Sequence, residues 1–181
     1  MSRRPRGTRP AIVVATLLTA GLALGGCSAG TVTNTDTVVS QAAGARGAVG
    51  AMVLLDMSID SGPAETVPSG VEVPLRGTIV NEGAEPDRLV SVSSPYAVGF
   101  RQEGAPVVPG ENAVRILGAE PGPAGPVDPA NRGLTASMRV VLTGVTQQLR
   151  AGPTYAVTFT FERAGAVTIP MIVVGSGPSE G

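Results

Sequence analysis

The stretch Thr154-Tyr155-Ala156-Val157-Thr158-Phe159-Thr160-Phe161 decides the fold class of this chain. Every second residue in it is valine or aromatic, and the residues between them are threonine or alanine. Because successive side chains of a β-strand point to opposite faces of its sheet, this alternation predicts a strand with one buried face. Three of the five aromatic residues of the chain lie in this stripe, where we expect them to pack in a core rather than stack on a ligand.

The same period of two continues along the chain on both sides of this stretch. Seven further segments are predicted as strands: residues 51–59, 71–80, 89–93, 96–101, 113–117, 136–142 and 166–174. Glycine, proline, asparagine or aspartate separates most of them, and no segment after residue 26 keeps the 3.6-residue period of a helix. About eight short strands at this spacing predict an antiparallel β-sandwich or barrel.

The composition excludes most catalytic chemistry. The 181 residues include no histidine, no tryptophan and one cysteine, and all 13 basic residues are arginine. Histidine is the usual general base, metal ligand and neutral-pH sensor, so histidine-based triads, metal centres and pH switches are excluded. The carboxylates Glu72, Glu103, Glu111 and Glu120 could act in pairs on a glycoside, but there is no tryptophan to stack against a sugar. We expect that the protein is not an enzyme.

The first 26 residues have the pattern of a lipoprotein signal peptide. Four arginines and no acidic residue occupy residues 1–10, and residues 11–24 are apolar, small or threonine. Leu24-Gly25-Gly26-Cys27 resembles the bacterial lipobox, in which the cysteine is lipidated and becomes the N-terminus after cleavage. We therefore expect acyl chains such as palmitate on Cys27 to anchor the mature protein to the outer face of the cell membrane, in the cell envelope. Both Sec and twin-arginine export remain open.

The mature chain is predicted to consist of a tether, one domain and a short tail. Residues 27–50 are rich in threonine, glycine and alanine, and predict a flexible tether with a root-mean-square span of roughly 25 Å. Residues 51–175 are predicted to form the β-domain, and residues 176–181 a disordered tail. Removal of the signal peptide leaves nine arginines against 14 acidic residues, so we expect no nucleic-acid partner.

Three segments carry a resemblance to a known family. Residues 87–95 (DRLVSVSSP), 142–152 (LTGVTQQLRAG) and 158–165 (TFTFERAG) resemble consecutive motifs of the periplasmic copper chaperones called PCuAC. With its lipobox and threonine-rich tether, the chain is most similar within that group to the actinobacterial and mycobacterial LpqE lipoproteins. The resemblance covers residues 51–174, and it implies a cupredoxin-like Greek-key antiparallel β-sandwich of about eight strands.

The resemblance also implies where copper ligands should lie. Those chaperones hold copper(I) with two histidines and two methionines, and the motif places one His-x-Met pair at Arg139 and Val141. The other histidine and methionine should fall within residues 96–133, which contain neither residue type. A fixed positive charge at Arg139 opposes a bound cation. We therefore interpret the family's copper site as not retained, and we expect no cofactor.

Methionines could still bind copper(I) in place of the missing ligands. The mature chain has four of them: Met52, Met57, Met138 and Met171. All four lie in apolar strand patterns, which favour a role as gap-filling core residues. Met52 and Met57 are separated by five positions, so they should face opposite sides of an unbroken strand.

Two other ligand sites can be considered. A hard cation could bind an acidic turn, although the spacing of the turn is not that of a calcium loop. The residues of this turn are Asn81, Glu82, Glu85 and Asp87. Arg139 could instead mark a pocket for a carboxylate or phosphate, since a guanidinium matches these groups; such a pocket should contain further donors.

The function that these observations favour is that of a non-enzymatic binding or adaptor module in the cell envelope. Its partner would be an envelope protein or an apolar envelope component, and residues 118–133, rich in proline and glycine, form the predicted surface loop most free to engage it. The alternative is a copper(I) chaperone that uses methionine ligands. The sequence leaves the identity of the partner and the oligomeric state open.

Overall fold

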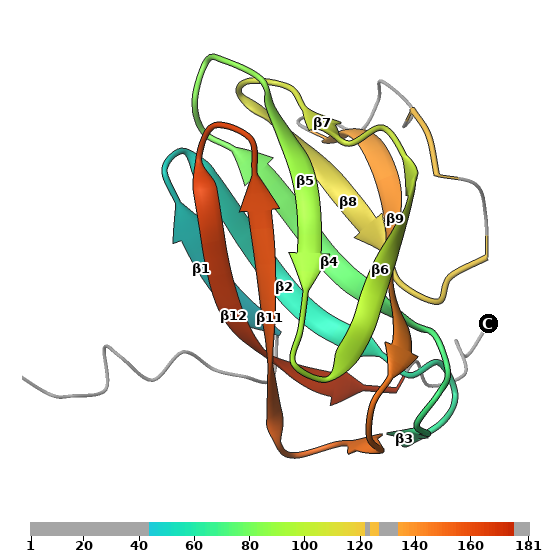
Figure 1. Cartoon of the computed structure of the whole chain (residues 1–181). Helices are drawn as coiled ribbons and strands as arrows, with labels where there is room; N and C mark the ends of the chain where they lie inside the picture. Colours follow the sequence, from blue (N-terminus) through green and yellow to red (C-terminus); the bar gives the residue numbers. More distant parts are fainter. Residues whose placement is uncertain (1–43, 122–123, 127–133, 176–181) are drawn as a thin grey trace, which may run out of the picture. The chain divides into compact units, whose positions relative to one another are not determined.

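The computed structural model describes residues 44–121, 124–126 and 134–175, which belong to one compact unit (Figure 1). This part of the chain is all-β, as predicted, and contains no helix. Its strands are β1 (Ala45–Val49), β2 (Met52–Asp60), β3 (Thr66–Val67), β4 (Val73–Asn81), β5 (Asp87–Ser93), β6 (Ala97–Gly104), β7 (Val107–Val108), β8 (Asn112–Leu117), β9 (Leu134–Val145), β10 (Leu149–Arg150), β11 (Thr154–Phe161) and β12 (Gly165–Val174).

Eight of these strands correspond to the eight predicted segments, and β3, β7 and β10 are two-residue additions. The fourth addition, β1, corrects the predicted domain boundary, because Ala45–Val49 lies inside the range expected to be tether. This strand pairs with β2, and it was missed because most of its residues are small. The small residues are needed for packing, since a Cβ on Gly47 would lie 2.9 Å from Cγ1 of Ile169 on β12. The folded domain therefore begins before residue 51.

Ten strands form one continuous sheet that curls around the core. Their order is β6-β9-β8-β4-β2-β12-β11-β5-β7, with β1 added beside β2. Figure 1 shows β5, β6 and β11 in front of β2, β4 and β8, so the sheet folds into the two layers of a sandwich. Most pairs are antiparallel, as predicted, but β12 runs parallel to β2 and β8 runs parallel to β9.

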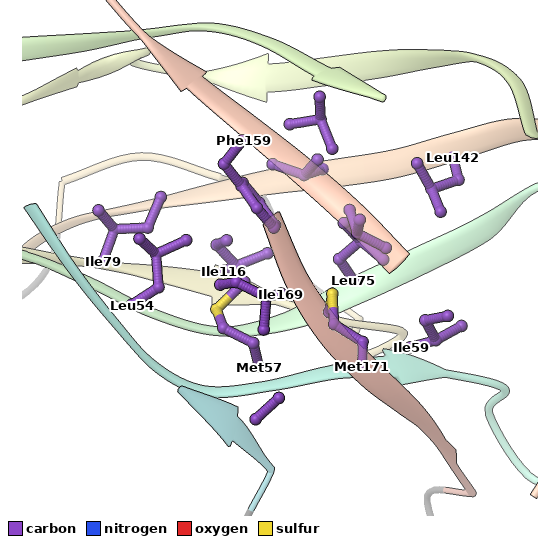
Figure 2. Close-up of a cluster of buried hydrophobic side chains, with 14 of the residues drawn as sticks. Leu54, Met57, Ile59, Leu75, Ile79, Ile116, Leu142, Phe159, Ile169 and Met171 are labelled. Carbon is purple, nitrogen blue, oxygen red and sulfur yellow. The ribbon is translucent and has the colours of Figure 1, made fainter. Parts of the chain in front are cut away.

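The core confirms the alternation that predicted β11. Tyr155, Val157, Phe159 and Phe161 are all buried, and they alternate with exposed or half-buried residues. Figure 2 shows Phe159 among aliphatic side chains from several strands. Full burial of a side chain of this size contributes about 1.5–3 kcal/mol, so this stripe is a major source of stability in a domain without disulfides.

A β-bulge interrupts β2 and changes which residues of the strand face the core. The pairing of β2 with β4 shifts between Leu55 and Ser58, and Asp56 has a positive φ of 54°. One extra residue reverses the phase of the alternation, so Met52 and Met57 are both fully buried. The expectation that these two methionines face opposite sides is wrong, because it assumed an unbroken strand.

Candidate functional site

The two positions that the resemblance assigns to copper ligands lie on the outer face of β9. Met138 and Val140 are fully buried in the core, so the intervening Arg139 and the following Val141 point away from it. Arg139 lies opposite Glu103 of β6, and Val141 lies opposite Arg101. The side chain of Arg139 is 17% exposed, and Val141 is buried although it lies outside the main core cluster.

Arg139 holds the chain segment that follows β8. Its Nη1 donates to the carbonyl of Gly118 at 2.8 Å, and its Nη2 donates to the carbonyl of Glu120 at 2.9 Å. Its Nε lies 3.8 Å from the carboxylate of Glu103. The observed role of this guanidinium is therefore to fix backbone, and a bound metal ion next to it would meet a fixed positive charge.

Arg101 lies between two of the carboxylates that were considered for glycoside chemistry. Its Nη2 donates to Glu72 at 3.0 Å, and its Nη1 donates to Glu103. The hydrogen bond and the charge of Glu72, with a smaller contribution from Glu103, raise the pKa of Arg101. Both carboxylates accept hydrogen bonds from the same guanidinium, so their observed role is to hold the side chain of Arg101.

The methionines are core residues. Met52, Met57, Met138 and Met171 are all fully buried within the main hydrophobic cluster. Figure 2 shows the thioethers of Met57 and Met171 among aliphatic carbon. Their burial agrees with the interpretation that these flexible side chains fill gaps in the core.

The acidic turn between β4 and β5 is built by structural hydrogen bonds. The side-chain amide of Asn81 donates to the carbonyls of Glu85 (2.8 Å) and Val108 (3.2 Å), and its oxygen accepts from the N–H of Gly83 (3.0 Å). Glu82 and Glu85 are exposed. Within residues 44–121, 124–126 and 134–175, no three histidine, cysteine, aspartate or glutamate side chains come together in a group that could hold a metal ion.

Asp87 joins this turn to the turn between β11 and β12. Its Oδ1 accepts from the N–H groups of Arg88 (2.7 Å) and Arg163 (3.0 Å), and its Oδ2 accepts from the N–H of Ala164 (2.9 Å). Burial raises the pKa of Asp87, but these three hydrogen bonds and the charge of Arg163 together lower it below the ordinary value of an aspartate. The side chain is therefore a structural clamp in its ionised form.

A second buried carboxylate, Asp60 at the end of β2, was not singled out from the sequence. Its Oδ2 lies 3.1 Å from Nη2 of Arg76 and accepts from the N–H of Ala119 at 3.0 Å. Its Oδ1 accepts from the N–H of Gly62 at 2.9 Å, two residues along the chain. An aspartate followed by Ser-Gly-Pro is a turn signal that could have identified the hydrogen bond to Gly62. The other partners, Arg76 and Ala119, lie 16 and 59 residues away, and the local sequence does not indicate them.

The structure contains shallow cavities at the ends of the strands. One of about 570 Å³ is lined by Pro63, Ala64, Glu65, Thr66, Arg150, Ala151 and Gly175. Another, of about 390 Å³, lies where the turns after β1, β4 and β11 meet. Neither includes Arg139, so the expected anion pocket around that residue is not formed by either of these cavities.

Several predicted features lie outside the described residues. These are Leu24, Gly25, Gly26 and Cys27 of the lipobox, the signal peptide, most of the tether and the C-terminal tail. In the part of the chain that the structure describes, no helix has the length and apolar character needed to cross a membrane.

Comparison with solved structures finds the same fold in copper-chaperone domains. The "Copper-bound PCuAC domain from PmoF2" matches with a TM-score of 0.54 and 21% identity over 72% of this chain and 98% of that chain. The "Apo PCuAC domain from PmoF1" matches with a TM-score of 0.53 and 19% identity over 72% of this chain and 99% of that chain. The "apo PmoF2 PCuAC domain" matches with a TM-score of 0.51 and 22% identity over 75% of this chain and 96% of that chain. These likenesses confirm the predicted cupredoxin-like β-sandwich, and at this identity they show the fold alone.

The comparison of sequences gives the family. No curated protein matches the chain. A family model described as "Putative lipoprotein LpqE-like" matches residues 57–173, which is more than half of the chain and nearly all of the β-domain. The chain belongs to the LpqE-like family, as its motifs predicted.

Proposed function

We propose that this protein is a membrane-anchored lipoprotein of the cell envelope whose PCuAC-like sandwich is a non-enzymatic binding module. The observation that carries this proposal is the state of the soft ligands that copper(I) requires. The chain has no histidine, its one cysteine is the predicted lipidation site, and its four mature methionines are buried in the core. The described residues therefore expose no thioether, imidazole or thiolate that could bind copper(I) at the surface.

The anchor is supported by the family and by the N-terminal sequence together. The description of the matching family includes the words "putative lipoprotein", and Cys27 follows Leu24-Gly25-Gly26 at the end of an apolar segment. Two or three acyl chains at about 0.8 kcal/mol per buried CH₂ give stable attachment, whereas a single chain gives only marginal binding.

Membrane fractionation tests the anchor. We expect the unchanged chain in the membrane fraction and the Cys27→Ala variant in the soluble or secreted fraction. Ser28→Ala is the matched control, because it changes the next residue and leaves the cysteine in place. Retention of Cys27→Ala at the membrane would count against anchoring by lipid attached to this residue.

Recovery of partners from detergent-solubilised envelopes tests the binding module. Full-length tagged protein is compared with a tagged protein that ends at residue 43 and so carries the predicted anchor and most of the predicted tether without the described strands. Enrichment of a component by the full chain alone supports the proposal. Equal recovery by both proteins would contradict it.

The second candidate function is copper(I) transfer through methionine ligands. It is favoured by one observation, the likeness of this fold to a PCuAC domain whose structure was solved with copper. The two candidates predict opposite results for copper(I) binding by the mature protein, because only the second requires the buried thioethers to reach a metal ion.

A further inference from the structure

Three arginines gather on the outer face of neighbouring strands. Arg76 lies on β4, Arg115 on β8 and Arg139 on β9, and β8 pairs with both of the other strands. The residue preceding or following each arginine is fully buried in the core: Leu75, Ile116 and Met138. Because side chains alternate along a strand, the three guanidinium groups extend from the opposite, outward face.

The chain folds back over these arginines as soon as β8 ends. Arg139 binds the carbonyls of Gly118 and Glu120, as described above. The N–H of Gly118 donates to the carbonyl of Leu75 at 3.1 Å, and the N–H of Ala119 donates to Asp60 at 3.0 Å. The backbone of residues 118–120 is therefore held against the outer face of the sheet.

This arrangement places the carboxylate of Glu120 between two guanidinium groups. Its Oε1 lies 3.2 Å from Nη2 of Arg115 and 3.6 Å from Nη2 of Arg76, and its Oε2 lies 3.3 Å from Nη2 of Arg115. An oxyanion bound by two guanidinium groups is a common way in which proteins recognise carboxylate and phosphate. The chain's own Glu120 occupies the position that an external oxyanion would take.

The site is built on a buried support but is open to solvent. Asp60 is almost completely buried and lies 3.1 Å from Arg76, so it orients that guanidinium from below. The side chains of Arg76, Arg115 and Glu120 are 33%, 48% and 42% exposed, so an ion can reach them. The Nε of Arg76 is buried and has no hydrogen-bond partner among the described residues. It lies close to Gly118, since a Cβ on that glycine would be 3.1 Å away.

We propose that Arg76 and Arg115 form a binding site for a phosphate or carboxylate group, and that Glu120 is its internal, displaceable occupant. A tethered group competes at an effective concentration in the millimolar range, so an external anion binds weakly while the carboxylate of Glu120 is present. Movement of residues 118–120 would also uncover Nε of Arg76 as a further donor. This inference rests on the proposed function, in which the sandwich is a binding module, and it names the ligand chemistry.

Titration with inorganic phosphate tests the site on the full chain in detergent. The variant Glu120→Gln keeps the shape of the side chain and removes its charge. We expect it to bind phosphate at least about tenfold more tightly than the unchanged chain, because the competing carboxylate is gone. Isothermal titration gives the affinity, and the side-chain N–H signals of Arg76 and Arg115 in NMR spectra locate the ion.

Two further variants make the result specific. The double variant Glu120→Gln, Arg115→Gln should not show the increased affinity for phosphate, since one of the two guanidinium groups is missing. Glu162→Gln removes an exposed carboxylate 3.4 Å from Arg88 and should behave like the unchanged chain. If Glu120→Gln does not fold, as judged by circular dichroism, Glu120→Ser replaces it.

The source of the anion is distinguished by a second arm. Mixed detergent micelles that contain phosphatidylinositol replace inorganic phosphate, with phosphatidylcholine micelles as the control. If Glu120→Gln has a higher affinity than the unchanged chain for inorganic phosphate alone, the site is assigned to a soluble anion. If the increase in affinity is larger for micelles that contain phosphatidylinositol, the site is assigned to a lipid headgroup. Equal binding by Glu120→Gln and the unchanged chain in both arms overturns the inference. That result would leave the anchor and the binding module standing, because fractionation and partner recovery test them separately.

Discussion

Asp87 provides a quantitative test of how the two turns beside β5 and β11 are held together. Its carboxylate accepts three backbone hydrogen bonds, from Arg88, Arg163 and Ala164, at 2.7–3.0 Å. In Asp87→Asn, the remaining carbonyl oxygen can accept the two bonds made by Oδ1, but the amide nitrogen faces the N–H of Ala164. A hydrogen bond to a charged group contributes about 1.5–3 kcal/mol, so we expect Asp87→Asn to lower the free energy of unfolding by about that amount at pH 7. Asp87→Ala, which removes all three bonds, should cost roughly 3–5 kcal/mol.

The pH dependence of this difference follows from the lowered pKa of Asp87. A carboxyl whose pKa is lower in the folded than in the unfolded state stabilises the fold above its unfolded pKa. That stability is lost as the pH falls through the folded pKa. The difference in unfolding free energy between the unchanged chain and Asp87→Asn should therefore be largest at pH 7 and should decrease below about pH 4.

Urea denaturation followed by circular dichroism at pH 7, 5 and 3 measures both effects. Asp56→Asn is the matched control, since Asp56 is exposed and its positive φ of 54° is one that asparagine adopts readily. We expect a change of less than about 0.5 kcal/mol for this control. An unfolding free energy of Asp87→Asn equal to that of the unchanged chain at pH 7, or a gap that does not depend on pH, would refute the role assigned to Asp87.

Three further substitutions test other parts of the fold by urea denaturation. Tyr155→Phe removes the hydroxyl that accepts from the N–H of Arg150 (3.0 Å) and donates to its carbonyl (3.3 Å), and should cost about 1–3 kcal/mol; no loss would show that these bonds contribute nothing. Gly77→Ala places a methyl group against Met57 Sδ and 2.9 Å from the carbonyl of Leu55, and should cost at least about 2 kcal/mol, while Gly125→Ala, with open space around it, should be nearly neutral. Ala45→Asp buries a charge in β1 and should cost about 3 kcal/mol or more, whereas the exposed Ala48→Asp should be tolerated; equal effects would restore the tether boundary at residue 50.

The strands that could be predicted from the sequence are those whose alternation is strong. In β11, aromatic and valine residues alternate with threonine or alanine over eight positions, and their burial follows that order without exception. The segment Ala45–Val49 shows no such signal, because its place in the sheet requires small residues rather than large apolar ones. Backbone pairing with the adjacent β2 defines this strand, whereas its packing against Ile169 of β12 depends on residues distant in the sequence.

The orientation of the methionines shows why counting positions fails at a bulge. The spacing of Met52 and Met57 predicts opposite faces, yet Asp56 adds one residue and brings both into the core. Nothing in the local sequence requires that bulge, since an aspartate in an apolar run also fits a regular exposed position.

Sequence reasoning singled out Arg139 and, as a carboxylate, Glu120, but not Arg76, Arg115 or Asp60. Arg139 was expected to oppose a cation or attract an anion, and the structure shows it binding the backbone of residues 118–120. The carboxylate of Glu120 lies between Arg76 and Arg115, which are 39 residues apart in the sequence, whereas Arg139 binds the backbone carbonyl of Glu120. Predicting such a cluster requires the order of the strands in the sheet, and the alternation of side chains along each strand does not reveal that order.

Copper(I) titration of the mature, full-length protein in detergent, against a colorimetric copper(I) chelator and under reducing conditions, tests most directly whether this sandwich has lost the chemistry of its structural neighbours. We predict that the chelator keeps the copper, because the methionines are in the core and the chain has no histidine. Binding of one copper(I) per chain with a dissociation constant below about 1 µM, abolished by Met→Leu substitutions that leave the fold intact, would contradict this prediction.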